Sequence, residues 1–115
     1  VTAPVAVLGD LAWSDLDIPS CLARNRDEIA SCVLRRPGYN SSRGYAISML
    51  TAEELDLPFL DARSTLCPDS RNCAPVVDGI VLYHDHHHLT TTMSKYLATP
   101  LGAALSQVVE GLSSP

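Results

Sequence analysis

Residues 80–90 read Ile-Val-Leu-Tyr-His-Asp-His-His-His-Leu-Thr. This stretch is the most informative part of the chain for both fold and function. Its first four residues are apolar or aromatic, which predicts a β-strand over Ile80–Tyr83. A helix is expected to begin near Thr90, because a threonine hydroxyl can accept a hydrogen bond from the first helical turn. The polar residues between them therefore lie at the carboxyl end of a strand, where open α/β sheets place their functional sites.

Asp85 and His88 are the residues of this loop that predict chemistry. A carboxylate near a histidine can hold the imidazole in the tautomer whose other nitrogen accepts a proton from a hydroxyl group. We expect an Asp85 oxygen within hydrogen-bonding distance of His88 Nδ1, with Nε2 facing an open groove. The loop thus supplies two of the three parts of a Ser-His-Asp triad, and the serine must come from elsewhere.

Two other interpretations of the histidine run remain open. His84, His86 and His88 alternate, so in an extended segment they would point to one side and could bind a transition metal together with Asp85. The sequence contains no second cluster of ligand residues, which weakens this hypothesis. A solvated turn without function is the other alternative, because polar loops between a strand and a helix are common. We assign no metal and no cofactor from the sequence.

Two further apolar segments have the character of strands. Val5-Ala6-Val7-Leu8 predicts a buried strand, and residues 57–61 predict the next strand with its exit. Helical patterns lie between and after them. Strands that alternate with helices favour a parallel sheet, so the predicted fold class is α/β.

The first two helices are predicted from a cap and from periodicity. A loop is expected over residues 9–20, followed by a helix that begins at Asn25 with Glu28 three residues on. A second helix is predicted over about residues 43–55. The residues expected to be buried on it are Ala46, Met49 and Leu50.

The last helix is predicted from an apolar stripe at helical spacing. The stripe consists of Met93, Leu97, Leu101, Leu105 and Val108. Pro100 lies inside it, and proline removes one backbone hydrogen bond of a helix. We therefore expect this helix to be interrupted or restarted at Pro100.

Four cysteines allow three disulfide pairings, and the sequence alone does not choose among them. Pairing Cys21 with Cys32 and Cys67 with Cys73 closes two short loops and is the simplest arrangement. Disulfides would indicate an oxidising compartment. Four reduced thiols in a cytosolic protein are the alternative. A zinc knuckle is disfavoured, because neither pair has the short spacing that such knuckles use.

Composition excludes several classes of protein. The chain has 115 residues, 46% of them hydrophobic, which suits one small domain but is short for a complete doubly wound sheet. Eight basic and 13 acidic residues give a net charge of −5, so a surface for nucleic acid or anionic lipid is not expected. No apolar run approaches the ~20 residues that cross a bilayer, and no signal peptide is visible.

Three motifs together support a family resemblance. They are the loop over residues 85–90, the segment Ile18-Pro19-Ser20-Cys21 followed by Cys32, and the pair Cys67 and Cys73 before the last strand. The chain resembles the carboxy-terminal half of the SGNH (GDSL-like) hydrolase domain, in the form fused behind actinobacterial membrane acyltransferases of the acyltransferase-3 type. The resemblance implies a partial flavodoxin-like three-layer sandwich over residues 1–115. It also implies that Asp85 and His88 match the family's catalytic aspartate and histidine.

The chain departs from the family pattern at the nucleophile. The family carries its serine in a Gly-Asp-Ser block and builds its oxyanion hole from a Gly and an Asn in two further blocks, and none of these is evident here. Gly9-Asp10-Leu11 is the nearest match, but it has Leu in place of the serine. None of the serines lies in Gly-Asp-Ser or Gly-x-Ser-x-Gly. We therefore expect a fragment, a split gene product or a degenerate copy.

The resemblance implies an extracytoplasmic acyltransferase or esterase that acts on O-acyl groups of cell-envelope glycans or lipids. An upstream membrane acyltransferase segment is then a candidate partner. The alternative from another class is a non-catalytic secreted domain that keeps the disulfides and has lost its chemistry. Trp13 could line an acyl or sugar pocket, although a lone Trp in a loop more often covers the edge of a core.

Overall fold

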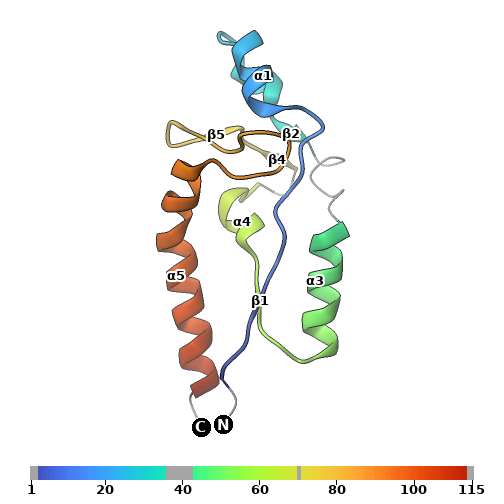
Figure 1. Cartoon of the computed structure of the whole chain (residues 1–115), viewed down its shortest axis with the longest axis vertical. Helices are drawn as coiled ribbons and strands as arrows, with labels where there is room; N and C mark the ends of the chain where they lie inside the picture. Colours follow the sequence, from blue (N-terminus) through green and yellow to red (C-terminus); the bar gives the residue numbers. More distant parts are fainter. Residues whose placement is uncertain (1–2, 36–42, 70, 114–115) are drawn as a thin grey trace.

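The computed structural model of the chain describes residues 3–35, 43–69 and 71–113. The elements, in chain order, are β1 (Val7–Leu8), α1 (Ile18–Arg24), the 3-10 helix η1 (Ile29–Cys32), β2 (Leu34–Arg35), α3 (Arg43–Glu54), β3 (Phe59–Leu60), α4 (Ala62–Leu66), β4 (Asn72–Cys73), β5 (Val76–Val77), β6 (Ile80–Val81) and α5 (Thr91–Ser113). The molecule is elongated, with principal extents of 54 × 25 × 20 Å (Figure 1).

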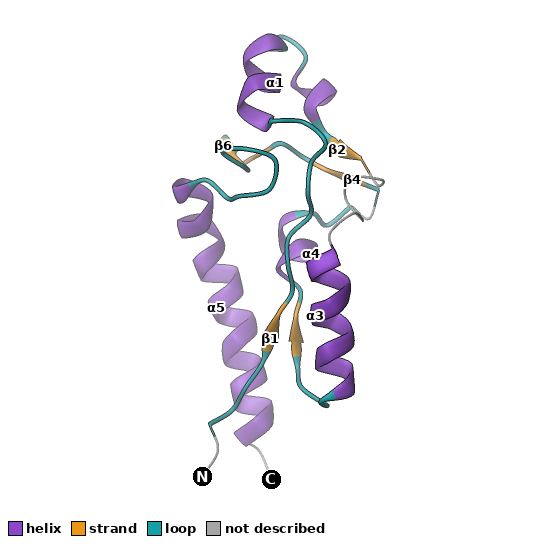
Figure 2. Ribbon diagram, turned by 45° about the vertical axis from the view of Figure 1, so that its right-hand side comes forward, coloured by secondary structure: helices purple, strands orange, loops and turns teal. Residues whose placement is uncertain are grey.

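A small parallel sheet lies in the middle of the molecule. β1 pairs with β3 in parallel, with Val7 opposite Phe59 and Leu8 opposite Leu60. The other two strand pairs, β2 with β4 and β5 with β6, are antiparallel. In both Figure 1 and Figure 2, β1 and β3 lie between α3 and α5, so the order of layers is helix, strand, helix. The prediction of an α/β fold with a parallel sheet is confirmed.

The hydrophobic core lies at the end of the molecule that carries α1 and the antiparallel strands. It gathers buried side chains from α1, β2, α4, β4, the residues directly after β6 and the first turns of α5. Its members are Ala12, Ile18, Leu34, Ala62, Leu66, Cys67, Cys73, Leu82, Tyr83, Met93 and Leu97. The Tyr83 hydroxyl donates a hydrogen bond to the Ala12 carbonyl and so ties the segment after β1 to the end of β6.

Both predicted disulfides are present, between Cys21 and Cys32 and between Cys67 and Cys73. Three of these four cysteines are buried in or beside the core: Cys32, Cys67 and Cys73. The first bridge joins α1 to η1, and the second closes the turn between α4 and β4. The two disulfides therefore stabilise the end of the molecule that also contains the hydrophobic core.

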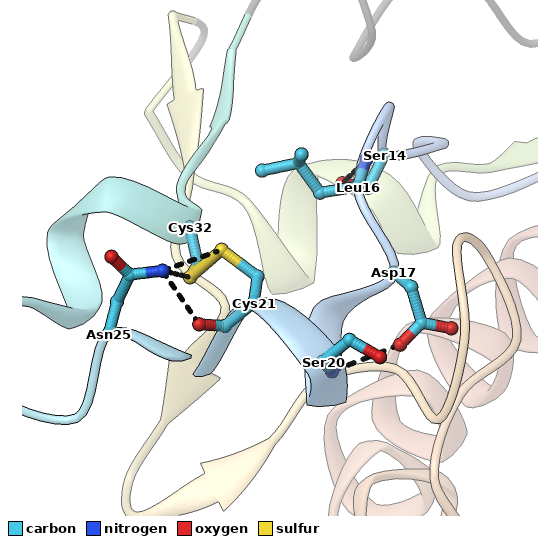
Figure 3. The surroundings of a disulfide bond; sticks show 7 residues. All are labelled: Ser14, Leu16, Asp17, Ser20, Cys21, Asn25 and Cys32. Atoms are coloured by element: carbon cyan, nitrogen blue, oxygen red, sulfur yellow. Dashed lines mark hydrogen bonds between the residues drawn. A yellow bond between two sulfur atoms is a disulfide. The ribbon is translucent and has the colours of Figure 1, made fainter. Parts of the chain in front are cut away.

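The loop predicted over residues 9–20 is observed only as far as Asp17, and the predicted helix start at Asn25 is wrong. A helix, α1, already begins at Ile18, because the Asp17 carboxylate accepts a hydrogen bond from the Ser20 N–H and Pro19 lies in the first turn. Asn25 instead ends α1, and its side-chain Nδ2 donates to the Cys21 carbonyl at 2.8 Å and lies beside the Cys21–Cys32 bridge (Figure 3). Only the short 3-10 helix η1 follows.

The helix predicted over residues 43–55 is confirmed as α3, but its expected burial is wrong. Ala46, Met49 and Leu50 are exposed, and Ala52 is the buried residue of this helix. α3 packs on β1 through one face. The apolar periodicity correctly identifies a helix, but among the described residues nothing covers the side where Ile47 and Leu50 lie.

The last helix, α5, runs through Pro100 without interruption, which corrects the expectation of a break. Proline removes only the hydrogen bond to the carbonyl four residues earlier, at Tyr96, and the neighbouring turns remain bonded. Met93 and Leu97 are buried as expected, whereas Leu105 is exposed. None of the described helices combines the length and the apolar character that a membrane span requires.

Candidate active site

The loop over residues 84–88 is closed at its base by backbone hydrogen bonds. The His84 N–H donates to the His88 carbonyl at 2.9 Å, and Tyr83 forms an antiparallel bridge with Leu89. Thr90 fixes the exit, because its Oγ1 donates to the Val81 carbonyl at 2.7 Å and accepts from the Met93 N–H at 3.1 Å. The predicted threonine cap of the last helix is confirmed, and the loop is held between β6 and α5.

The Asp85 carboxylate is fixed by both of its oxygens. Oδ1 accepts hydrogen bonds from the backbone N–H groups of His87 and His88, each at 2.8 Å. Oδ2 lies 2.7 Å from Nδ1 of His88. The expected contact between Asp85 and His88 is therefore confirmed, and its geometry is set by the turn itself.

These hydrogen bonds favour the ionised form of Asp85. The backbone N–H of His87, followed by that of His88 and by the His88 ring, holds the pKa of the Asp85 carboxyl well below its usual range. Asp85 is consequently a carboxylate at neutral and mildly acidic pH. A carboxylate at Nδ1 favours the tautomer that leaves Nε2 free to accept a proton, and it stabilises the imidazolium that then forms.

The other histidines take separate roles. His86 turns toward the segment after β1, where its Nδ1 lies 3.1 Å from the Ser14 carbonyl and its own carbonyl accepts the Ser14 N–H. The His87 ring stacks on Trp13, with centroids 4.0 Å apart. The alternative in which His84, His86 and His88 all point to one side does not hold, because the segment is a closed loop and His86 turns away from the other two.

Trp13 lies between the loop and a cavity. It lines a hollow of about 230 Å³ together with Leu16, Val33 and Leu34, among others. Its ring stacks on His87, and the His87 ring lies 4.0 Å from that of His88. A row of three rings thus leads from the hollow to the Asp85–His88 pair, which agrees with the interpretation of Trp13 as a pocket residue.

No hydroxyl group of a described residue is hydrogen-bonded to the His88 ring, whose recorded partner is Asp85. Gly9 and Asp10 do not form a nucleophile block either, because Leu11 follows them where the block needs a serine. The nearby Ser14 hydroxyl accepts the Leu16 N–H at 3.0 Å and is buried. The described residues therefore present a base and its carboxylate without a bonded nucleophile.

A protein-family comparison bears on this arrangement. The model of the SGNH domain fused to AT3 domains matches residues 2–102. The chain belongs to this SGNH family. Its helix–strand–helix layers and parallel β1–β3 pair are those of a partial flavodoxin-like fold. No curated protein and no solved structure is significantly similar to the chain.

Two features of this candidate site could not be predicted from the sequence. The sequence did not indicate that His84 lies side by side with His88 while His86 turns away, because this depends on the pairing of Tyr83 with Leu89 across the loop. It also did not indicate that Trp13 stacks on His87, a contact between residues far apart in the sequence. The Asp85–His88 contact was predictable because it lies within one turn.

Proposed function

We propose that this chain is the carboxy-terminal part of an extracytoplasmic SGNH-type esterase or O-acyltransferase and supplies its Asp–His pair. The nucleophile lies on a polypeptide segment outside residues 1–115. The observation that carries the proposal is the Asp85–His88 contact of 2.7 Å, with the second carboxylate oxygen held by two backbone N–H groups.

The pair would act as a general base and then as a general acid. His88 Nε2 accepts the proton of the nucleophilic hydroxyl while that oxygen attacks the ester carbonyl, and Asp85 stabilises the imidazolium. His88 then returns the proton to the departing alcohol, which leaves an acyl-enzyme. Transfer of the acyl group to water makes the domain an esterase, and transfer to another hydroxyl makes it an acyltransferase.

The free edge of β1 supports the idea that a further segment completes the domain. The N–H groups of Val7 and Gly9 donate to Pro58 and Leu60 on the β3 side, each at 2.9 Å. Alternate residues of a strand face opposite neighbours, so the backbone of Leu8 is directed to the other edge. No described strand occupies that edge. Its exposed N–H and C=O groups suit another β-strand.

The side chains around this edge are apolar and exposed. Val5 and Leu8 of the β1 segment are more than half exposed, as are Ile47, Leu50 and Leu55 on and after α3. A parallel sheet is normally covered on both faces, and two strands alone rarely form a stable sheet. The radius of gyration, 15.7 Å, also exceeds the ~13 Å of a compact chain of this length. We infer that the occupant is a strand of the segment that carries the nucleophile.

The substrate class and the compartment rest on less direct support. Two disulfides fit an oxidising compartment, which supports an extracytoplasmic location. Fusion of this family to AT3 domains supports acyl transfer beside a membrane acyltransferase, and the resemblance suggests cell-envelope glycans or lipids as acceptors. The hollow beside Trp13 is a candidate site for the acyl or sugar group.

A non-catalytic, disulfide-stapled domain is the second candidate. The observation in its favour is that no hydroxyl of a described residue is bonded to His88. In this case the free edge of β1 would accept a partner without any catalysis.

A fluorophosphonate probe separates the two candidates. The isolated chain should not be labelled. The chain joined to a segment that carries the Gly-Asp-Ser block, called here the completed domain, should be labelled on that serine. His88→Ala should then reduce the labelling rate by about 10³–10⁴-fold, as disruption of a triad typically does.

The matched control is His86→Ala, which removes an imidazole of the same loop whose Nδ1 lies against the Ser14 carbonyl. It should leave labelling unchanged. A completed domain that folds but is not labelled would support the non-catalytic candidate. Stoichiometric labelling of the isolated chain would contradict the proposal that the nucleophile lies elsewhere.

A further inference from the structure

Three side chains of the loop bring potential metal ligands to one place. The Nδ1 or Nε2 atoms of His84 and His88 and a carboxylate oxygen of Asp85 all lie within 4.8 Å of one another. Asp85 Oδ2 is 2.7 Å from His88 Nδ1 and 3.7 Å from His84 Nδ1. The two imidazole rings are nearly parallel, with centroids 5.6 Å apart.

The backbone fixes this arrangement. The hydrogen bond from the His84 N–H to the His88 carbonyl places these residues side by side at the base of the loop. The N–H groups of His87 and His88 occupy Asp85 Oδ1 and leave Oδ2 directed at the two imidazoles. A metal ion would therefore find its ligands already gathered and would have little backbone to reorganise.

The ligand set is that of a zinc-like ion. Two imidazole nitrogens and one carboxylate oxygen form the protein ligands of many zinc sites, with a fourth position open to water. Zinc bonds of ~2.0–2.1 Å place the ligand atoms of a tetrahedral site about 3.3 Å apart. Two ligand atoms separated by the full 4.8 Å would therefore have to approach each other by about 1.5 Å. The His84 and His88 side chains are 62% and 60% exposed, which leaves them room to rotate by that amount.

We propose that His84, Asp85 and His88 form a binding site for Zn²⁺ or a similar divalent transition metal, and that the bound ion switches the acid–base pair off. The ion takes the place of the Nδ1 proton that joins His88 to Asp85, and this proton leaves to solvent. His88 can then no longer be oriented by Asp85. The binding site stands on the geometry alone, whereas its inhibitory effect rests on the function proposed above.

The structure offers a matched pair of histidines for the test. His84 lies beside Asp85 Oδ2, whereas His86, two residues on, directs its Nδ1 to the Ser14 carbonyl. Both side chains are exposed, and neither belongs to the proposed catalytic pair. A metal bound by the loop as a loose run of histidines would depend on both equally, but a metal bound at the proposed site depends on His84.

The experiment is a calorimetric titration of the whole chain with zinc chloride in a buffer that does not bind zinc. We expect one saturable site. His84→Ala should weaken it by about 10-fold or more, since removing a ligand costs at least as much as disturbing its support, and His86→Ala should leave it unchanged. Histidine ¹⁵N spectra should show zinc-dependent shifts at His84 and His88.

Equal losses of zinc affinity in His84→Ala and His86→Ala would contradict the proposed site. The absence of saturable zinc binding by the wild-type chain would contradict it as well. The titration uses no substrate, so its outcome is independent of the function proposed for the completed domain. In the completed domain, zinc should suppress probe labelling, and His84→Ala should relieve that suppression while keeping the labelling itself. Labelling that is insensitive to zinc at concentrations that saturate the site would overturn the inhibitory role.

Discussion

The end of the molecule that carries the Asp85 loop and the end that carries β1, α3 and β3 differ in how much of their apolar surface they bury. At the first, called here the stapled end, α1, β2, α4 and the start of α5 enclose the core, and both disulfides lie there. At the second, the open end, α3 exposes Ile47 and Leu50, and β1 exposes Val5 and Leu8. Figure 1 shows these two ends along the long axis.

The difference indicates which end is complete. A base and its carboxylate must be held rigidly to work, and the stapled end holds them with its own backbone, core and cross-links. Exposed apolar side chains on both α3 and β1 mark a contact surface. Changes at the stapled end should therefore alter the stability of the fold, whereas changes at the open end should alter its association with a further segment.

The largest contrast should come from truncating one leucine at each end. Leu97 is 5% exposed in the core, so Leu97→Ala should lower the free energy of unfolding by about 2–5 kcal/mol. Leu50 is 59% exposed, so Leu50→Ala should change it by less than ~0.5 kcal/mol. Urea denaturation of the isolated chain measures both. Equal destabilisation by Leu97→Ala and Leu50→Ala would show that the open end is packed in solution. The two ends would then not differ in how much apolar surface they bury.

Removing the disulfides should have the next largest effect. The bridges span sequence separations of 11 and 6 residues. Loop-closure entropy then gives about 3 kcal/mol for the pair Cys21→Ala and Cys32→Ala, and about 2 kcal/mol for the pair Cys67→Ala and Cys73→Ala. Thermal or urea unfolding of the two double variants checks the order. An unchanged unfolding midpoint in both variants would mean that the stability of the stapled end does not depend on its disulfides.

The smallest effect concerns pH and the Asp85 turn. The folded-state pKa of Asp85 is lowered from its unfolded value of ~3.9. The stability that this carboxylate contributes is therefore present above that pH and is lost as the pH falls through the lowered value. The urea midpoint of the wild type should consequently fall more steeply below about pH 4 than that of Asp85→Asn. Parallel curves would show that the turn does not depend on the carboxylate.

Features that depend on residues close together in the sequence could be predicted from the sequence alone. The Asp85–His88 contact, the Thr90 cap and both disulfide pairs lie close in the sequence and were all predicted correctly. The start of α1 at Ile18 was missed, and a helix was wrongly predicted from Asn25, because Asp17, a second capping residue, lies earlier in the chain.

Features that depend on distant partners could not be predicted. The helix over residues 43–55 was correctly predicted, but periodicity does not say what covers a helix face, so the predicted burial of Leu50 was wrong. The placement of His84 beside His88 follows from pairing across the loop. The stack of Trp13 on His87 joins two separate segments. In each case the missing information was tertiary.

Amide hydrogen exchange at β1 tests the central claim most directly. In the isolated chain the N–H groups of Val7 and Gly9, which are bonded to Pro58 and Leu60, should exchange slowly, and that of Leu8 should exchange fast. In the completed domain, Leu8 should become protected as well, because the added strand accepts its N–H. Protection of Leu8 in the isolated chain, or its continued fast exchange in a completed domain that reacts with the probe, would contradict the account.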